Sequence, residues 1–368
     1  MTSTAPTYRL GVLLGDGIGP EIVPASVSVV DAALAAVGAP PVEWVELPMG
    51  LSAIPEHGTA LPAVTLDALA ETDGWLLGPI DGVAYPEPQR SQLNPSGALR
   101  KHFDLYANIR PARAFSAGRV VVPDADLVIL RENTEGFYAD RNTFAGTGEF
   151  MPTADVAVTM GVITRAAVER IAVAAFELAQ RRRKHLTIVH KANVLRLSMG
   201  LFRDVCREVG ERYPDVVVDD FHIDAMTVHL VRRGGDFDVL VAENMFGDIL
   251  SDLTGELAGS LGIAPSLNSS DTRAMAQAAH GSAPDIAGRD VANPIAMILS
   301  AAMLLDWLGR RRGDERLAAA ARNIDEAVRT VVEGGASTRD LGGTAGTSSF
   351  TAAVVERIAT APALAARS

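Results

Sequence analysis

The sequence predicts an α/β protein with a largely parallel sheet. Short runs of β-branched residues alternate with longer segments whose apolar residues recur at helical spacing, which is typical of strand-helix-strand units. The chain has 368 residues, more than one domain usually contains, so we expect two domains. Hydrophobic residues make up 48% of the chain and charged residues 21%, so the chain can form a packed core.

The first part of the chain shows the alternation clearly. An apolar run is followed by a glycine loop, and then by a segment with apolar residues at helical spacing that ends at Gly38. The predicted elements are a strand at 8–14, the loop at 15–19, a helix at 21–37, strands at 42–47 and 74–78, and a helix at 62–72.

The rest of the chain repeats this order and then becomes helical. Thr164 has the side chain of a helix N-cap and precedes a helical segment at 165–180. Residues 137–160 are rich in Gly, Thr and small apolar residues and predict a long arm that reaches a partner subunit. Apolar runs predict strands at 127–130, 186–190, 216–219 and 237–242. Helical spacing predicts helices at 198–212, 225–232, 294–308, 314–332 and 349–360.

Charge and cysteine content narrow the class of function. With 33 basic and 45 acidic residues the formal net charge is −12, which disfavours nucleic acid and anionic membranes as partners. An anionic substrate therefore needs a local basic pocket. Cys206 is the only cysteine, so no internal disulfide is possible. The N-terminus lacks signal-peptide features and no stretch approaches about 18 uninterrupted apolar residues, so we expect a cytoplasmic protein.

The loop GDGIGP at 15–20 lies between a predicted strand and a predicted helix, as a dinucleotide fingerprint does. Pro20 stands where the GxGxxG pattern needs a spacer before its last glycine, so the loop fails as a Rossmann fingerprint. The alternative is a tight turn whose glycines adopt unusual backbone angles.

Two carboxylates, Asp248 and Asp252, are four residues apart just after a predicted strand, so a helix would place them on one face. Hard oxygen ligands with room for water suit Mg²⁺ or Mn²⁺. Asp224, at the end of another strand, is a candidate third ligand. The alternative is a solvated acidic face.

One lysine, three arginines and one tyrosine are further candidate site residues. Lys191 follows a predicted strand at the end where α/β proteins bind ligands, and a lysine can lose its proton when its pKa is lowered. Arg100, Arg110 and Arg131 together could clamp carboxylates. Tyr138 is a candidate proton donor. The alternatives are a surface lysine, surface ion pairs and a packed tyrosine.

A loop with the sequence HGSAPDIAG at 280–288 is rich in small and polar residues that could hold a nucleotide. Asp285 in this loop would accept a hydrogen bond from a ribose 2′-hydroxyl and repel a 2′-phosphate, which favours NAD over NADP. The alternative is an ordinary turn.

Together these motifs resemble the β-decarboxylating dehydrogenases, which act on isocitrate, isopropylmalate, homoisocitrate, and tartrate or D-malate. The resemblance covers nearly the whole chain. It is specific because all of the motifs occur in this order, although no single motif is specific. The motifs are GDGIGPE (15–21), LRKHFDLYANIRP (99–111), RENTEGFY (131–138), HKANV (190–194), DAM (224–226), NMFGDILSD with GSLG (244–262), and HGSAPDIAG with ANP (280–294).

The resemblance implies a homodimer of two-domain α/β subunits with an isopropylmalate-dehydrogenase-like fold that is not a Rossmann fold. Residues 1–105 and 259–368 would form a large, nucleotide-binding domain that contains both termini. Residues 106–258 would form a small domain with the metal, catalytic and dimer-forming residues, and its arm at about 137–160 would join the subunits.

The resemblance also implies the site residues of an NAD-dependent oxidative decarboxylation of a 3-substituted malate. Asp248 and Asp252 of one subunit and Asp224 of the other would hold Mg²⁺ or Mn²⁺, which polarises the new carbonyl so that CO₂ leaves. Lys191 from the second subunit would receive the hydroxyl proton, and Tyr138 would protonate C3. The implied substrate-binding residues are Ser96, Arg100, Arg110 and Arg131, and the implied cofactor-binding residues are Asn193, His280, Gly281, Ser282, Ala283, Asp285 and Asn293.

Two departures from the family pattern bear on specificity. Gln277-Ala278-Ala279 stands where members often have Glu-Pro-Val, so cofactor contacts there would differ. Asn94-Pro95-Ser96 stands where isopropylmalate enzymes place leucines, and losing that apolar wall would cost about 1–3 kcal/mol. We therefore expect a polar or small γ-group, with 3-isopropylmalate as the alternative substrate.

Two other functions remain open at this point. Heteromeric relatives contain non-catalytic regulatory subunits, but here the implied catalytic residues are all present. A metal-dependent phosphoryl-transfer enzyme is disfavoured because the chain has no GxxxxGK[ST] loop.

Overall fold

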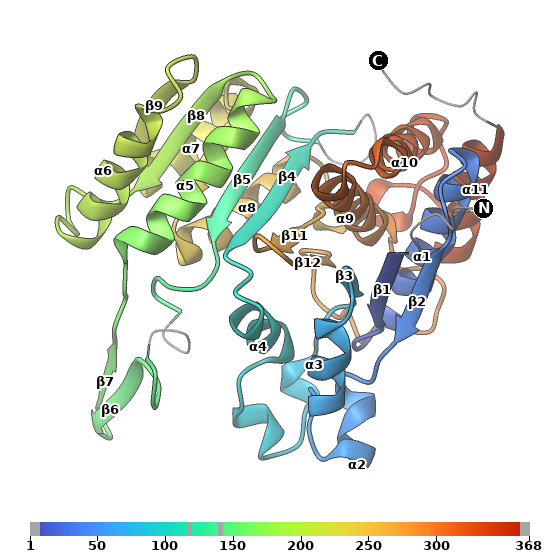
Figure 1. Ribbon diagram of the computed structural model, residues 1–368, viewed down its shortest axis with the longest axis horizontal. Coiled ribbons are helices and arrows are strands. Elements are labelled where there is room, and N and C mark those ends of the chain that lie inside the picture. Colours follow the sequence, from blue (N-terminus) through green and yellow to red (C-terminus); the bar gives the residue numbers. More distant parts are fainter. Residues whose placement is uncertain (1–7, 116–119, 139–142, 361–368) are drawn as a thin grey trace, which may run out of the picture.

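One ten-stranded sheet runs through the protein in the order β2-β1-β3-β12-β11-β4-β5-β10-β8-β9. The computed structural model describes residues 8–115, 120–138 and 143–360. Strand pairing is parallel in both outer parts of the sheet, as predicted, but antiparallel in the centre, from β12 through β11 and β4 to β5. Helices flank the sheet in both outer parts (Figure 1). The sheet strands are β1 (Tyr8–Leu13), β2 (Val42–Glu46), β3 (Gly74–Leu77), β4 (Ala107–Arg113), β5 (Asp126–Glu132), β8 (His185–His190), β9 (Val217–His222), β10 (Val239–Ala242), β11 (Leu267–Ser269) and β12 (Ala274–Gln277).

One hydrophobic core joins the two ends of the chain. It lies beside the β1 end of the sheet, and its centre is α9 (Ile295–Arg312), which is buried on most of its surface. A helix was predicted here at 294–308. The other helices of this core are α1 (Gly19–Ala36), α10 (Glu315–Glu333) and α11 (Thr347–Thr360).

Two further cores lie on either side of the β5-β10-β8 part of the sheet, and they are formed almost entirely by residues between 107 and 258. These residues lie within the segment 106–258, for which a small domain was expected. The helices here are α5 (Arg165–Gln180), α6 (Ser198–Gly210), α7 (Ile223–Arg233) and α8 (Asn244–Leu257).

A two-stranded arm projects away from the body of the protein, at the lower left of Figure 1. It consists of β6 (Glu149–Thr153) and β7 (Val156–Thr159), and every residue of β6 is exposed. The arm was predicted over 137–160, of which residues 139–142 lie outside the described part of the chain.

One short helix was predicted with slightly wider bounds, and two others were not predicted. The helix expected at 62–72 is shorter, α3 (Ala63–Ala70), and α2 (Ile54–His57) and α4 (Pro95–His102) had no predicted counterpart. Asn94 is the N-cap of α4, because its side chain accepts a hydrogen bond from the Ser96 amide at 2.9 Å.

Among the described residues, α1 is the helix that is long and apolar enough to cross a membrane by length and composition. In the structure Ile22, Val29 and Leu34 of α1 are fully or almost fully buried in the core. Its apolar character is thus accounted for by packing.

Candidate active site

The candidate site is a cavity of about 300 Å³ between the two groups of cores. It lies where β5, β3 and β12 end, which brings together residues far apart in the sequence. Of the predicted site residues, the cavity is lined by Ser96, Arg100, Arg110, Arg131, Tyr138, Asp248, His280 and Gly281, and Gln277 lines it as well.

The acidic pair lies on α8, whose first turn is capped by Glu243 through the amides of Met245 and Phe246. Asp248 and Asp252 both accept hydrogen bonds from the same nitrogen, Arg110 Nη1, at 3.2 and 3.3 Å. The predicted shared helical face is therefore confirmed. The two carboxylates therefore point at one position, which the Arg110 guanidinium group occupies.

The pKa values of the two carboxyl groups shift in opposite directions. Burial raises the pKa of Asp248, but Arg131 and Arg110 outweigh it, so the pKa lies below the usual range. For Asp252, burial and the neighbouring Asp248 charge prevail over Arg110, and the pKa is raised. The partly buried Asp248 carboxylate thus lies beside two arginines, whereas the more exposed Asp252 carboxylate is opposed by the Asp248 charge.

Arg131 is the most buried cation of the site, with 2% of its side chain exposed. Its Nε donates to Asn244 Oδ1 at 2.8 Å, and its Nη1 pairs with Asp248. Gly247 permits this approach, since a Cβ there would lie 2.6 Å from Arg131 Cβ. Tyr138 donates its hydroxyl hydrogen to Asp248, so the phenol also points at the acidic pair.

Lys191 and Asp224 form a separate pair outside the cavity. Lys191 follows β8 and donates to Asp224 Oδ1, in the first turn of α7, at 2.5 Å. The hydrogen bond from Lys191 lowers the pKa of Asp224, whose side chain is 70% exposed. Within the described residues, no group of three His, Cys, Asp or Glu side chains could hold a metal ion. Asn193 is exposed in the same loop as Lys191.

The glycine loop at 15–20 is a tight turn, as the alternative interpretation stated. Gly15 and Gly17 have φ angles of 69° and 57°, and the Ile18 amide donates to the Ser282 carbonyl at 2.9 Å. Asp16 accepts from the Leu51 and Asp81 amides. The loop at 15–20 is therefore hydrogen-bonded to the loop at 280–288, the one predicted to bind the nucleotide.

The loop at 280–288, which was predicted to bind the nucleotide, combines an exposed carboxylate with a buried imidazole nitrogen. Asp285 is exposed, and His280 Nε2 is buried with no hydrogen-bond partner among the described residues. Burial lowers the pKa of His280, which favours the neutral ring. Asn293 donates to Asp340 Oδ2 at 2.9 Å, which ties the end of the loop to the C-terminal part of the chain.

Comparisons with known proteins identify the family of this chain. A family model described as "Isocitrate/isopropylmalate dehydrogenase" matches residues 9–358. The chain belongs to this family. It is 44% identical to an isocitrate/homoisocitrate dehydrogenase of Thermus thermophilus, over 95% of this chain and 98% of that protein. It is 40% identical to the 3-isopropylmalate dehydrogenase of Archaeoglobus fulgidus, over 93% and 97% of the two chains.

A solved structure gives the same result. The crystal structure of isocitrate dehydrogenase from Methylococcus capsulatus matches with a TM-score of 0.84 and 38% identity, over 96% of this chain and all of that chain. The protein is thus an oxidoreductase of the isocitrate/isopropylmalate dehydrogenase family that acts on CH–OH groups of small hydroxy acids. The named relatives fit an oxidative decarboxylation of 3-substituted malates, and the family uses NAD(P) with Mg²⁺ or Mn²⁺.

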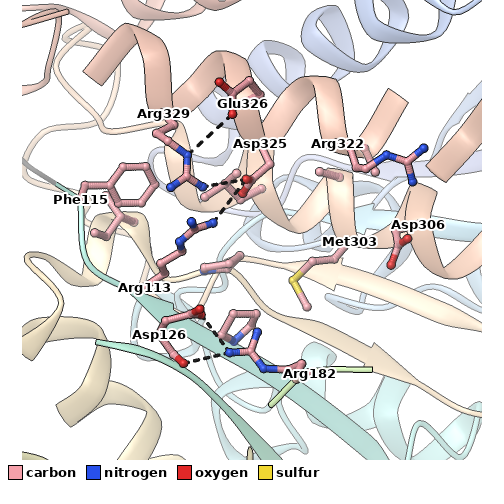
Figure 2. Close-up of a pocket in the computed structure, with 16 residues that line it drawn as sticks. Arg113, Phe115, Asp126, Arg182, Met303, Asp306, Arg322, Asp325, Glu326 and Arg329 are labelled. Atoms are coloured by element: carbon pink, nitrogen blue, oxygen red, sulfur yellow. Dashed lines mark hydrogen bonds and ion pairs between the residues drawn. The ribbon is translucent and has the colours of Figure 1, made fainter. Parts of the chain in front are cut away.

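A larger cavity of about 820 Å³ lies on the opposite face of β4 (Figure 2). Arg110 points toward α8, whereas Pro111 and Arg113 line this second cavity, as alternation along a strand requires. Several of its charged groups pair with one another, for example Arg113 with Asp325 at 3.7 Å. None of the predicted site residues lines this cavity, so the smaller one is the candidate active site for this family member.

Sequence reasoning missed several residues that organise the site. Gln277 was noted only as a departure from a motif, yet it contacts Ser96 in the cavity. Asp340 accepts from Ser260, Asn293 and Thr338, and no local spacing pointed to it. Asn244 begins the NMFGDILSD motif, and this position was the one available signal for its contact with Arg131.

Proposed function

We propose that this family member is an NAD-dependent enzyme that oxidises and decarboxylates a 3-substituted malate with a polar or small γ-group. The carrying observation is that three arginines, a tyrosine and an aspartate, predicted from separate motifs, line one cavity. A non-catalytic regulatory subunit would not need all of them.

The arginines bind the substrate's carboxylates in this proposal. Arg110 and Arg131 are buried and already hold carboxylates, those of Asp248 and Asp252. Planar guanidinium groups form paired hydrogen bonds with carboxylates, which fixes the orientation of the substrate as well as its affinity. Arg100 lines the same cavity from α4.

The acidic pair fits a divalent cation. Asp248 and Asp252 offer hard oxygen ligands that already reach one common position on Arg110 Nη1, which is the donor set that Mg²⁺ and Mn²⁺ prefer. Lewis-acid polarisation of the substrate's C2 oxygen is the chemistry that such an ion supplies when bound.

Lys191 and Tyr138 handle the protons. Lys191 accepts the proton of the C2 hydroxyl, and Tyr138 donates a proton to C3 after CO₂ has left. The hydrogen bond from Tyr138 to Asp248 fixes the phenol at the cavity wall. Lys191 lies outside the cavity of its own chain, so we propose that it serves the cavity of a second copy.

An exposed apolar surface supports this homodimer. Val228 and Val231 on α7 are 53% and 47% exposed, Ile249 on α8 is 52% exposed, and Val194 and Leu197 follow Lys191. Contiguous exposed apolar side chains mark association surfaces. A two-fold contact here would bring Lys191 and Asp224 of each copy to the acidic pair of the other.

The arm is a second contact of the proposed dimer. Phe150, Met151 and Val156 on β6 and β7 are 49%, 62% and 46% exposed, although a two-stranded ribbon is only marginally stable by itself. Packing of the arm against the partner would cover these side chains.

The nucleotide loop supports NAD binding. The exposed Asp285 carboxylate can accept from a ribose hydroxyl and would repel a 2′-phosphate. His280 Nε2, which has no hydrogen-bond partner in the described part of the chain, fits a polar group of the nucleotide. Asn193, Gly281, Ser282, Ala283 and Asn293 are the other residues that we propose to contact it. A hydride acceptor is what the nicotinamide supplies when bound. We also propose a cytoplasmic location, since the single cysteine is a buried thiol.

The second candidate substrate is 3-isopropylmalate. Ile80 and Leu93 also line the cavity, so an isopropyl group would meet some apolar surface there. Polar residues of the same wall, Asn94 and Ser96, favour the first candidate.

The test follows NADH formation with isocitrate, homoisocitrate, D-malate, tartrate and 3-isopropylmalate in the presence of Mg²⁺ or Mn²⁺. Lys191→Met and Tyr138→Phe should fold normally and lose most turnover, since general acid-base groups contribute about 10²–10⁴-fold. Turnover near the wild-type rate in either variant, or a preference for NADP⁺, would contradict the corresponding assignment.

A further inference from the structure

We propose that His190 is a positioning residue for Lys191, through a hydrogen bond that the backbone amide of Ala192 donates to His190 Nδ1. The inference rests on the proposed function, in which Lys191 accepts the proton of the C2 hydroxyl. His190 is the last residue of β8, directly precedes Lys191 and is 1% exposed.

The contacts of the His190 ring fix its tautomer. The Ala192 nitrogen lies 3.0 Å from Nδ1, and a backbone amide can only donate, so Nδ1 carries no hydrogen. The hydrogen of the neutral ring is then on Nε2, which donates to Asp220 Oδ1 at 2.7 Å. Burial lowers the pKa of His190 despite this aspartate, and the neutral ring is the form that keeps an acceptor at Nδ1.

The ring is held in place from two sides. Asp220 in β9 accepts from Arg207 of α6 through its other carboxylate oxygen. The His222 ring packs edge-on against the His190 ring, with 5.3 Å between the centroids and 84° between the planes. Because Asp220 and His222 belong to the strand that pairs with β8, the imidazole cannot turn without losing contacts to β9.

The hydrogen bond from Ala192 acts on the peptide group that directly follows Lys191. The Lys191 carbonyl and the Ala192 amide belong to one planar unit. Its oxygen accepts from the amides of Val194 and Leu195 at 3.1 and 2.9 Å, and its N–H donates to the His190 ring. This unit is thus held at both ends, and β8 holds the backbone before Lys191. The direction of the Lys191 side chain is therefore set by the backbone.

The same ring contacts lead to the acidic partner of Lys191. His222, which packs against the His190 ring, is the N-cap position of α7, and Asp224 lies in the first turn of that helix. Lys191 Nζ donates to Asp224 Oδ1 at 2.5 Å. In the proposed dimer, His190 therefore orients the pair of side chains that this chain supplies to the cavity of the second copy.

Loss of the acceptor at Nδ1 would leave a buried amide without a partner and would free the peptide unit to rotate. Ala192 is 8% exposed, so water does not readily replace the ring. The Lys191 amine stands at the end of a four-carbon side chain, so a small backbone rotation displaces it by roughly 1 Å. A misplacement of about this size can cost about 10²-fold in rate. We therefore expect the acceptor to affect kcat more than KM.

Two variants separate the roles of the two ring nitrogens. His190→Asn places Oδ1 near the position of Nδ1, where it accepts from the amide two residues further on, but it does not reach Asp220. His190→Gln reaches Asp220 with its amide nitrogen but offers no acceptor at the position of Nδ1.

The experiment measures kcat and KM of both variants with Mg²⁺, NAD⁺ and the malate derivative that the wild-type enzyme oxidises fastest. His190→Asn should keep kcat within about threefold of the wild type. His190→Gln should lower kcat at least about tenfold and change KM by less than about threefold. Urea unfolding and near-UV circular dichroism show whether each variant is folded, since each loses one hydrogen bond of the same ring.

A second measurement does not depend on the folding of either variant. The chain has 7 histidines, and ¹⁵N spectra of the histidine-labelled wild-type protein show which ring nitrogen of each carries hydrogen. The His190 signals are those that persist when the other histidines are replaced in turn. Hydrogen on Nε2 alone is expected, and hydrogen on Nδ1 would refute the role of His190.

The outcomes distinguish this inference from the proposed function. If the wild-type enzyme oxidises no malate derivative, or if Lys191→Met keeps its turnover, the proposed function is wrong and the role of His190 fails with it. If the wild-type enzyme is active and requires Lys191, but His190→Gln has a kcat equal to or above that of His190→Asn, the role of His190 is refuted while the proposed function stands.

Discussion

Heterodimers of two inactive variants test whether the active site is shared between chains. Lys191→Met removes the proposed base, and Asp252→Asn removes one proposed metal ligand. Each homodimer has two damaged sites. In a heterodimer one site contains both substitutions, while the other receives Lys191 from one chain and Asp252 from the other, and is intact.

The expected turnover of the heterodimer depends on which residues of one chain enter the same active site. Lys191 and Asp224 lie 2.5 Å apart, and Asp248 and Asp252 share Arg110 Nη1, so each pair enters a site as a unit. One intact site of two gives the heterodimer about half of the wild-type turnover per dimer. The Lys191→Met parent should retain about 1% or less, because loss of a general base costs about 10²–10⁴-fold. The Asp252→Asn parent should also lose most of its turnover, because it lacks a ligand of the proposed cation.

The assay needs purified heterodimers. The two chains are co-expressed with different affinity tags, isolated over both columns in turn, and assayed for NADH formation. A heterodimer of Lys191→Met with Asp224→Asn is the matched control, because both residues enter the same site and neither site is then intact. A Lys191→Met/Asp252→Asn heterodimer as inactive as its parents, or an active control, would refute the shared site.

Three stability predictions concern groups outside the cavity of the candidate active site. Arg182→Met should lower the free energy of unfolding by about 3 kcal/mol, because Arg182 pairs with the fully buried Asp238 at 2.7 Å. Arg113→Met in the same larger cavity (Figure 2) should cost at most about 1 kcal/mol, because its pair with Asp325 is half exposed. Glu135→Gln should gain stability relative to the wild type as the pH rises from 4.5 to about 7, because burial raises the pKa of Glu135 to about 7 and the folded protein must then ionise it. Urea unfolding measures all three; equal losses for the two arginine variants, or a pH-independent difference for Glu135→Gln, would contradict these expectations.

The sign of the Glu135 prediction depends on its surroundings. Burial and the charge of Glu132 raise its pKa, whereas the hydrogen bonds from Thr164 and the charge of Arg170 lower it. A carboxyl group with a raised pKa binds its proton more tightly in the folded state. Its contribution to stability is therefore present below pH 4.5 and is lost as the pH rises through about 7.

Elements with strong local signals were predictable from the sequence. The helix at 165–180 agrees in both bounds with α5, because Thr164 Oγ1 accepts from the Ala167 amide at 3.2 Å as an N-cap should. The central strands β11 and β12 have three and four residues and were missed. Their pairing with distant strands, rather than their own composition, makes them strands.

The candidate site also has a part that the sequence predicts and a part that it does not. The helical spacing of Asp248 and Asp252 predicted their common face without knowledge of the fold. The partners of Gln277 and Asp340 could not be predicted, since Ser96 lies 181 residues from Gln277, and Ser260 lies 80 residues from Asp340. Contacts between residues so far apart in the sequence depend on the tertiary fold, and the spacing of residues along the chain carries no information about them.

The ion pairs of the cavity connect substrate binding to cation binding. Arg110 and Arg131 pair with Asp248, the carboxylate that we propose as a metal ligand, and the same arginines are proposed to bind the substrate. These pairs must be exchanged, so that the arginines hold substrate carboxylates while Asp248 and Asp252 hold the cation. A bound substrate would free Asp248 from the arginines, and a bound cation would free the arginines from Asp248. Whichever binds first therefore lowers the free-energy cost of binding the other. By linkage, the cation must then raise the affinity for substrate by the same factor by which substrate raises the affinity for the cation.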